Sequence, residues 1–316
     1  MLRRLIVLVS LFLLAASAIS CNRGTTSSDG RPRVALVLKT LNNPFFIEMQ
    51  RGAEDAAKAL NVELTVQAAE RETDVDKQMQ IIENLIQAKV DALAITPSGS
   101  REVVPAIGKA NQANIPVVVV DTRLDAKAAA EAGVRTATFV GSDNYKGGQL
   151  IGEYLVKASG GKAKVAILEG IAGHETGDSR VRGFRDATKA APGITIVASQ
   201  TANWERDQGF NVFQNILQAH PDVDTVFACN DMMALGAIEA INAAGKAGGI
   251  RVLGFDAVQD ARLALERGTM AATVAQYPDE MGKAAVEMAV KAIKGESLRP
   301  DVGVRIGLVT KENAGR

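Results

Sequence analysis

The chain has 316 residues, with 36 Lys and Arg against 36 Asp and Glu, so its formal net charge is zero. This balance argues against a nucleic-acid-binding protein, which needs clustered positive charge. A hydrophobic content of 47% and a charged content of 23% are those of a globular protein long enough for two domains. The two cysteines cannot build a disulfide framework, and a polytopic membrane protein would need several apolar runs of about 20 residues.

Residues 1–20 have the pattern of a secretory signal peptide. Arg3 and Arg4 precede an uncharged stretch, residues 5–20, which is short for a membrane span. We therefore expect an exported protein, located in the periplasm or at the cell surface.

Cys21 follows Ala18-Ile19-Ser20, which resembles the lipobox of bacterial lipoproteins, in which the cysteine is lipidated. The alternative is ordinary cleavage at Ala16-Ser17-Ala18, which leaves Cys21 as a free thiol. Residues 21–32 are polar and rich in Gly, Ser and Thr, so they predict a flexible tether with a reach of roughly 18 Å. Lipidation of Cys21 would hold the folded body close to a membrane.

From residue 33 onward, short β-branched runs alternate with helical patterns. The predicted strands are 34–38, 62–66, 92–96, 117–120, 138–140, 165–168, 195–198, 225–228 and 252–255, and the clearest helices are 45–60, 75–87, 146–158, 208–218 and 232–243. Such alternation is typical of parallel sheets with helices on both faces. Over this length it predicts a doubly wound α/β fold divided into two lobes.

Polar residues follow several predicted strands. Asn43 precedes Pro44 and suits the N-cap of a helix that begins with proline. Asn230-Asp231 and Asp256 stand at similar junctions. All lie at the carboxyl ends of strands, where open α/β sheets bind ligands.

No catalytic signature is present in the sequence. GxSxG, GxxxxGK[ST], HExxH and CxxC are all missing. His174 and His220, the only histidines, are far apart and have no neighbouring ligands at metal-binding spacing, so we expect neither a metal nor a cofactor. We assign no role to His174, interpret Cys229 as a buried inert thiol, and interpret residues 70–77 as a solvated loop and first helical turn.

The run Leu38-Lys39-Thr40-Leu41-Asn42-Asn43-Pro44-Phe45-Phe46 resembles the first strand-to-helix turn of periplasmic monosaccharide-binding proteins of the ribose and allose type, the substrate-binding components of sugar ABC transporters. Further matching segments occur in the same order, namely 113–116 with Asp121, 141–144, 169–173, 197–200, 219–223, 230–236, 254–256 and 271–278. The similarity extends from about Arg33 to the C-terminus.

The resemblance implies a clamp of two similar lobes joined by three crossing segments. Carried onto this chain, it implies one lobe of residues 33–142 and 277–304 and another of 143–276 and 305–316. The crossings are expected near Ser142-Asp143, Gln276-Tyr277 and residues 304–306. Closure of such a hinge on a ligand is an established kind of transition.

The resemblance also implies the sugar site. Sugars need flat aromatic walls and planar hydrogen-bonding groups. The walls would be Phe45, Phe46 and Trp204, and the hydrogen bonds would come from Asn43, Asp121, Arg180, Asn230, Asp256 and Gln276. A second tier of candidates, at positions where this chain departs from ribose binders, is Lys39, Thr96 and Arg123. Lys39 resembles the allose-binding branch, and Arg123 is displaced by one position from the usual Asp-Arg pair.

Each of these residues also has a purely structural interpretation. Phe45, Phe46 and Trp204 would serve equally well in a hydrophobic core. Asn43 and Asn230 would serve as helix caps. Asp121 and Asp256 would serve as ordinary turn residues.

We therefore predict an extracytoplasmic receptor, not an enzyme, that captures a monosaccharide and delivers it to a membrane ABC permease whose ATPase is a separate chain. Ribose, allose and a psicose-like ketose all remain candidates, and we expect a monomer. The alternative is a sugar sensor for a chemotaxis or kinase partner. A transcription regulator would need a helix-turn-helix where the signal stands. A carbohydrate-active enzyme would use Asp121 and Asp256 as its carboxylate pair.

Overall fold

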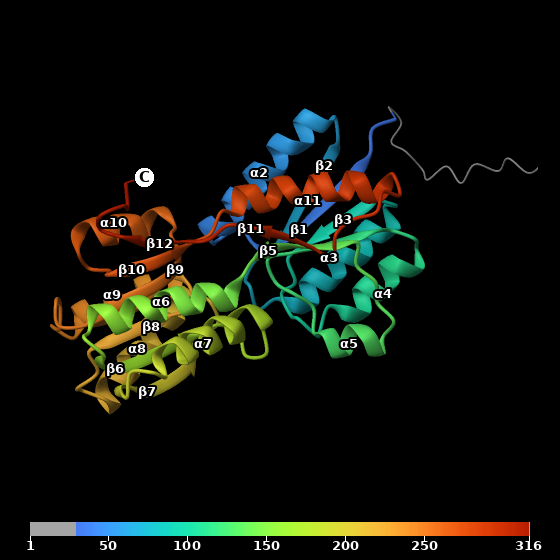
Figure 1. The fold of residues 1–316 in the computed structure, drawn as a ribbon. Coiled ribbons are helices and arrows are strands. Elements are labelled where there is room, and N and C mark those ends of the chain that lie inside the picture. Colours follow the sequence, from blue (N-terminus) through green and yellow to red (C-terminus); the bar gives the residue numbers. More distant parts are fainter. Residues whose placement is uncertain (1–29, 316) are drawn as a thin grey trace, which may run out of the picture.

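The computed structural model describes residues 30–315, which form two lobes, each built on a six-stranded sheet (Figure 1). Lobe 1 contains β1 (Arg33–Thr40), α2 (Pro44–Leu60), β2 (Glu63–Ala69), α3 (Val75–Gln87), β3 (Ala92–Ile95), α4 (Val104–Gln112), β4 (Val117–Val120), α5 (Ala126–Glu131), β5 (Thr138–Ser142), α11 (Pro278–Ile293) and β11 (Asp301–Val304). Lobe 2 contains α6 (Asn144–Ala158), β6 (Lys162–Glu169), α7 (Glu175–Thr188), β7 (Gly193–Thr201), α8 (Arg206–Ala219), β8 (Thr225–Ala228), α9 (Asp231–Ala243), β9 (Arg251–Asp256), α10 (Gln259–Arg267), β10 (Ala272–Ala275) and β12 (Gly307–Thr310).

The two sheets have equivalent strand orders, β11-β5-β4-β3-β1-β2 and β12-β10-β9-β8-β6-β7. Neighbouring strands are parallel except for β12, which is antiparallel to β10. In each lobe the first strand lies between the second and the third, and this reversal of direction opens a crevice at the carboxyl ends of the strands. The predicted doubly wound α/β fold with two lobes is confirmed.

The chain passes between the lobes three times, between β5 and α6, between β10 and α11, and between β11 and β12. The last passage arises because β11 pairs with β5 of lobe 1 whereas β12 pairs with β10 of lobe 2. Figure 1 shows these segments running side by side between the two lobes. They form the only route by which one sheet is joined covalently to the other within the described chain.

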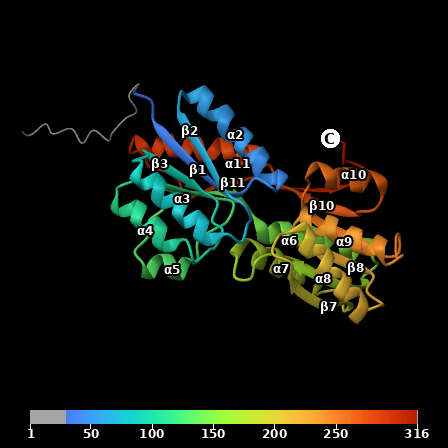
Figure 2. The ribbon, with the colours of Figure 1, turned by 180° about the vertical axis from the view of Figure 1, so that it is seen from behind.

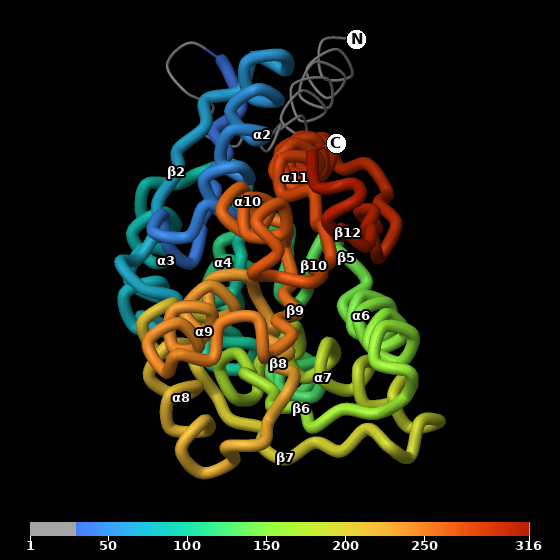
Figure 3. Tube along the Cα trace, turned by 90° about the vertical axis from the view of Figure 1, so that its left-hand side faces the viewer, coloured from blue at the N-terminus to red at the C-terminus, as the bar shows by residue number. Residues whose placement is uncertain are grey.

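Helices cover both faces of each sheet. In β1, Val34, Leu36 and Leu38 pack with residues of α2 and α11, whereas Ala35 and Val37 pack with residues of α3 and α4. A strand buried on both sides needs an uninterrupted apolar run, which is why β1 shows no polar alternation. In lobe 2, α6 and α7 lie on one face of the sheet and α8 and α9 on the other (Figures 1 to 3).

Two pairs of helices approach each other closely through glycine. A Cβ atom on Gly52 of α2 would lie 2.0 Å from the Asp279 carbonyl oxygen of α11, and one on Gly282 would lie 1.9 Å from that of Met49. In lobe 2, a Cβ atom on Gly148 of α6 or Gly183 of α7 would lie 2.1 Å from a carbonyl oxygen of the other helix. Backbone therefore packs directly on backbone in both pairs.

Among residues 30–315, no helix has both the length and the apolar character needed to cross a membrane.

Candidate functional site

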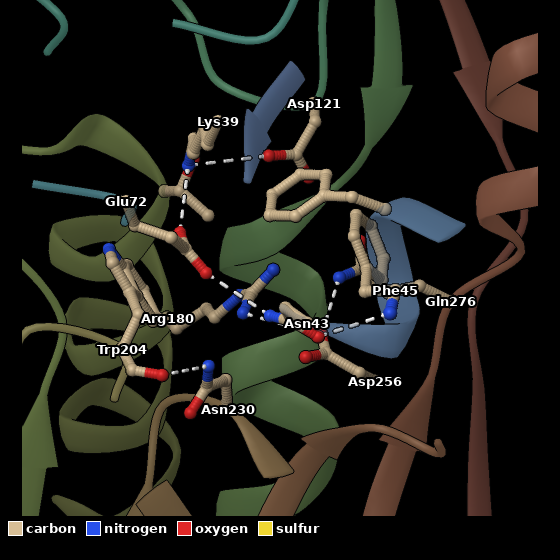
Figure 4. A pocket seen from close by; sticks show the side chains of 12 residues that line it. Lys39, Asn43, Phe45, Glu72, Asp121, Arg180, Trp204, Asn230, Asp256 and Gln276 are labelled. Atoms are coloured by element: carbon tan, nitrogen blue, oxygen red, sulfur yellow. Dashed lines mark hydrogen bonds and ion pairs between the residues drawn. The ribbon is translucent and has the colours of Figure 1, made fainter. Parts of the chain in front are cut away.

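A pocket lies between the lobes at the carboxyl ends of their strands, with a cavity volume of about 20 Å³. Twelve residues line it (Figure 4). Lobe 1 contributes Lys39, Asn43, Phe45, Phe46, Glu72 and Asp121; lobe 2 contributes Thr176, Arg180, Trp204, Asn230 and Asp256; and Gln276 lies on a crossing segment.

The first turn of α2 supplies an aromatic wall. Asn43 is the N-cap, and its Oδ1 accepts a hydrogen bond from the Phe45 backbone N–H at 3.1 Å. The rings of Phe45 and Phe46 meet edge to face, with centroids 5.2 Å apart. Both rings also belong to the buried core of lobe 1, so the core and pocket interpretations hold together.

A buried charge cluster completes the lobe 1 half. Lys39 Nζ lies 3.6 Å from Glu72 Oε2 and 3.7 Å from Asp121 Oδ2. Asn43 Nδ2 donates to Glu72 Oε1 at 3.1 Å. Burial raises the pKa of Glu72 to about 7, although Lys39 and Asn43 favour its charged form.

The lobe 2 half is organised around Arg180. Its Nη1 donates to the Cys229 carbonyl oxygen at 2.7 Å and its Nε donates to Asn144 Oδ1 at 2.9 Å. The guanidinium carbon lies 3.8 Å from the centroid of the Phe255 ring, and Nη1 lies 3.7 Å from Asp256 Oδ1. The side chain is therefore held in place before any ligand arrives.

Asp256 and Gln276 connect lobe 2 with a crossing segment. Gln276 Nε2 donates to Asp256 Oδ1 at 2.8 Å. Burial raises the pKa of Asp256 well above its usual value, although Arg180 opposes the shift. Gln276 Oε1 is buried and accepts no hydrogen bond from the described residues. Since buried polar atoms are normally paired, this oxygen is an acceptor available to a ligand.

Trp204 forms the second aromatic wall and is 4% exposed. Its indole packs on Gly170, where an added Cβ atom would lie 2.0 Å from Cζ2. Asn230 Nδ2 donates to the Trp204 carbonyl oxygen at 3.0 Å, while Asn230 Oδ1 caps α9 by accepting from the Met233 N–H. Trp204 also belongs to the core of lobe 2, so it is both a core residue and a wall of the pocket.

His174 lies behind this wall. Its Nδ1 accepts from Trp204 Nε1 at 3.4 Å, and burial together with Lys39 lowers its pKa to about 3. The histidine is thus neutral and fixes the indole ring in position, a role that sequence analysis leaves unassigned.

The two lobes touch around the pocket. At its rim, Arg71 of lobe 1 forms ion pairs with Glu205 and Asp207 of lobe 2, at 3.5 Å and 3.6 Å. Deeper, Thr176 Oγ1 lies 3.1 Å from Thr122 Oγ1. These contacts describe a closed clamp.

All nine principal candidates from the sequence line the pocket, as does Lys39. The structure places Thr96 and Arg123 elsewhere. Thr96 is fully buried and its hydroxyl donates to the Val37 carbonyl oxygen at 3.3 Å. Arg123 stacks on Phe139 at 3.7 Å and pairs with Asp301 at 2.6 Å, because the one-residue displacement points it away from the cleft.

Glu72 and Thr176 also line the pocket, although the sequence did not predict them as site residues. The interpretation of residues 70–77 as solvated is wrong for Glu72, which is 4% exposed. The strand was predicted to end at residue 66, but β2 continues to Ala69, so Glu72 follows a strand end as closely as Asn43 does. A correct strand end would have identified Glu72 by the rule that found Asn43.

Two other assignments concern cysteines. Cys229 is fully buried, as predicted, and burial raises the pKa of its thiol to about 12. Cys21 lies outside the described residues.

Within residues 30–315, no group of three or more His, Cys, Asp or Glu side chains is placed to hold a metal ion.

Known proteins are similar to this chain in sequence and in fold. A family model described as "Periplasmic binding protein domain" matches residues 34–297. The ribose import binding protein of Salmonella typhimurium is 39% identical over 311 residues, covering 98% of this chain and 99% of that protein. A D-ribose/D-allose-binding protein of Pseudomonas aeruginosa is 40% identical over 271 residues, covering 84% of each.

Among solved structures, a solute-binding protein of an ABC transporter from Actinobacillus succinogenes, with bound D-allose, has a TM-score of 0.84 and 42% identity, and the match covers 90% of this chain and 99% of that chain. Matches of this extent, in sequence and in fold, establish that the chain belongs to the periplasmic binding protein family.

Proposed function

We propose that this protein is an extracytoplasmic receptor that captures one monosaccharide between its lobes and delivers it to a membrane ABC permease. The observation that carries the proposal is the composition of the pocket. Phe45, Phe46 and Trp204 offer apolar surfaces to the C–H faces of a sugar ring, and buried amides, carboxylates and one guanidinium surround them. A neutral polyol satisfies such a set of donors and acceptors.

Ribose, allose and psicose-like sugars are the proposed ligands. The named ligands of the relatives in Salmonella and Pseudomonas, and the D-allose bound in the Actinobacillus protein, support this choice. Of the second-tier candidates, only Lys39 lines the pocket, and it is the one that links this chain to allose binders.

Closure of the clamp is the proposed signal to the permease. A ligand stabilises the closed form because only that form satisfies donors and acceptors of both lobes at once. Gln276, on a crossing segment and bonded to Asp256, would report ligand occupancy to the hinge. The ATPase would be a separate chain, as expected of a receptor that performs no chemistry.

We further propose that the protein is exported as a monomer and anchored to a membrane by lipid on Cys21. The signal-like residues 1–20 and the polar tether 21–32 support this proposal. Mass spectrometry of the mature protein tests it, because a lipidated Cys21 at the new N-terminus adds the mass of acyl chains. Cleavage at Ala18 with an unmodified Cys21 would contradict it.

A thermal-shift screen of the mature protein against pentoses, hexoses and ketoses tests the sugar assignment, with calorimetry for each hit. A ligand at about 1,000 times its Kd adds roughly 4 kcal/mol to stability and raises the Tm by several degrees. We expect one sugar of the ribose, allose or psicose group to give the largest shift. No shift with any sugar would overturn the proposal.

A further inference from the structure

Glu72 is a pocket residue for which the sequence suggests no function. Its side chain is 6% exposed and comes from the loop after β2. It contacts two members of the proposed ligand set, Lys39 through Oε2 and Asn43 through Oε1 (Figure 4). A buried carboxylate is costly unless its partners are fixed, so this arrangement needs a reason.

The Lys39 ammonium makes no direct hydrogen bond to either neighbouring carboxylate. Its two carboxylate neighbours, Glu72 and Asp121, are at 3.6 Å and 3.7 Å, which is beyond hydrogen-bond length. It also lies within 6 Å of two aromatic rings, 5.8 Å from the Phe46 centroid and 5.9 Å from that of Trp204. An ammonium group has three donors and needs acceptors. An oxygen atom of a ligand between the walls would accept from it.

Glu72 also fixes the amide of Asn43. Asn43 Oδ1 is engaged with the Phe45 N–H, and one Nδ2 proton goes to Glu72 Oε1. The second Nδ2 proton remains, and the amide cannot rotate without breaking both bonds. One carboxylate therefore contacts two donors that line the pocket.

We propose that Glu72 is a specificity-determining residue, which sets Lys39 and Asn43 as a pair of oriented donors and itself accepts from the ligand hydroxyl that they engage. The inference rests on the proposed function as a sugar receptor. A hydroxyl at this position donates to Glu72 while accepting from Lys39, so both its functions are used. A sugar without that hydroxyl, or with it in the epimeric position, leaves the buried charges without a partner.

The test combines protein variants with altered ligands. The Kd of the best sugar from the screen, and of each of its monodeoxy analogues, is measured by calorimetry for the wild type, Glu72→Gln and Lys39→Met. Glu70→Gln is the matched control, because Glu70 lies two residues before Glu72 in the same loop and is exposed. The Tm of each ligand-free variant shows that it is folded.

We expect Glu72→Gln to weaken binding of the parent sugar at least tenfold, with no change for Glu70→Gln. The tenfold penalty should vanish for one deoxy analogue and persist for the others, because only one hydroxyl contacts Glu72. Lys39→Met should show the same dependence on the analogue and carries the test if Glu72→Gln does not fold. An equal loss of affinity for every analogue would show that Glu72 only supports the structure of the pocket. That result would overturn the inference about Glu72 but not the proposed function. A wild-type protein that binds no sugar would overturn the proposed function and this inference with it.

Discussion

The two lobes share one topology and yet present different chemistry to the pocket. In lobe 2, Arg180 is held by hydrogen bonds of 2.7 Å and 2.9 Å and by stacking on Phe255. In lobe 1, Lys39 stands 3.6 Å and 3.7 Å from its carboxylates, with no direct hydrogen bond to either. The fold fixes where the side chains emerge, at the carboxyl ends of the strands, and the individual residues decide how firmly each half is organised.

This difference suggests a division of roles. A half whose polar groups are already bonded loses little entropy when a ligand binds, so lobe 2 is the organised surface. The lobe 1 half gains its last hydrogen bonds from the ligand and from closure. Four measurements test this division of roles, and their expected effects decrease from the aromatic wall of lobe 2 to the rim of the pocket.

Trp204→Ala should remove both an aromatic wall of the pocket and a part of the lobe 2 core. Because the indole is buried and belongs to the lobe 2 core, we expect the free energy of unfolding to fall by about 3 kcal/mol or more, together with loss of sugar binding. Denaturant unfolding with and without sugar measures both. Trp204→Phe, which retains a ring, should lose less stability. An unchanged free energy of unfolding for Trp204→Ala would contradict the core role.

Asp256→Ala and Asp121→Ala compare the carboxylates of the two halves. Removing Asp256 takes away the carboxylate beside Arg180 and the acceptor of Gln276 Nε2 in a buried site, so the Kd for sugar should rise at least tenfold, about 1.4 kcal/mol. Asp121→Ala should cost less, because Lys39 retains Glu72. Calorimetry measures both values. A larger loss for Asp121→Ala would reverse the assignment of lobe 2 as the organised half.

The pH dependence of stability should separate the lobes. The pKa of Glu72 is raised by burial from 4.5 to about 7, so the folded state binds its proton more tightly than the unfolded state does. The stability of the ligand-free protein should therefore rise as pH falls from 8 to 6.5, by about 1 kcal/mol from this residue. Denaturant unfolding at several pH values measures the change.

Glu72→Gln should remove the lobe 1 share of this slope. Asp231→Asn should remove the part of the slope that Asp231 contributes in lobe 2, because burial raises the pKa of Asp231 to about 7 as well. Below pH 6.5 the trend should weaken, since the buried neutral His174, with its pKa lowered to about 3, favours unfolding as acid protonates the unfolded chain. A slope unchanged in both variants would show that neither carboxylate titrates in this range.

Arg71→Ala should have the smallest effect. Its ion pairs with Glu205 and Asp207 join the lobes only at the exposed rim, where solvent screens such pairs and they contribute little to stability. We expect a few-fold rise in the Kd at low salt that disappears in about 1 M salt. The Kd measured at two salt concentrations tests this, with Arg135→Ala as a control for loss of an exposed charge. A salt-independent loss would indicate a role deeper than the rim.

Much of the fold is readable from sequence because it depends on local patterns. Each predicted strand corresponds to a strand of the structure, since runs such as Val117–Val120 have the length and β-branched content of buried parallel strands. Missing from the prediction are the short strands β10 to β12. Sequences such as Asp301–Val304, half exposed and containing glycine, carry little apolar signal.

The site was predictable to the extent that it follows strand ends and resembles a known family. Four residues lie at the end of a strand or within three residues after it, and all line the pocket, namely Asn43, Asp121, Asn230 and Asp256. Glu72 was missed because an error of a few residues in the end of β2 turned a pocket residue into an apparent surface one. Arg123 shows the converse error. A shift of one residue in the sequence places its side chain on the Phe139 ring and not in the pocket. Side-chain direction is a tertiary property that spacing alone does not give.

The glycine contacts of α2 with α11 and of α6 with α7 have a mechanical consequence. Both α6 and α11 begin where the chain enters a lobe from a crossing segment, and their partners carry Arg180 and Phe45 into the pocket. Backbone on backbone leaves no flexible side chain to absorb displacement. Each helix pair is therefore expected to move as one rigid body. A rotation of a few degrees at the crossing segments would then displace the pocket residues on these helices directly. The same rigidity makes the outer ends of these helices suitable places for paired fluorophores that convert closure into an optical signal.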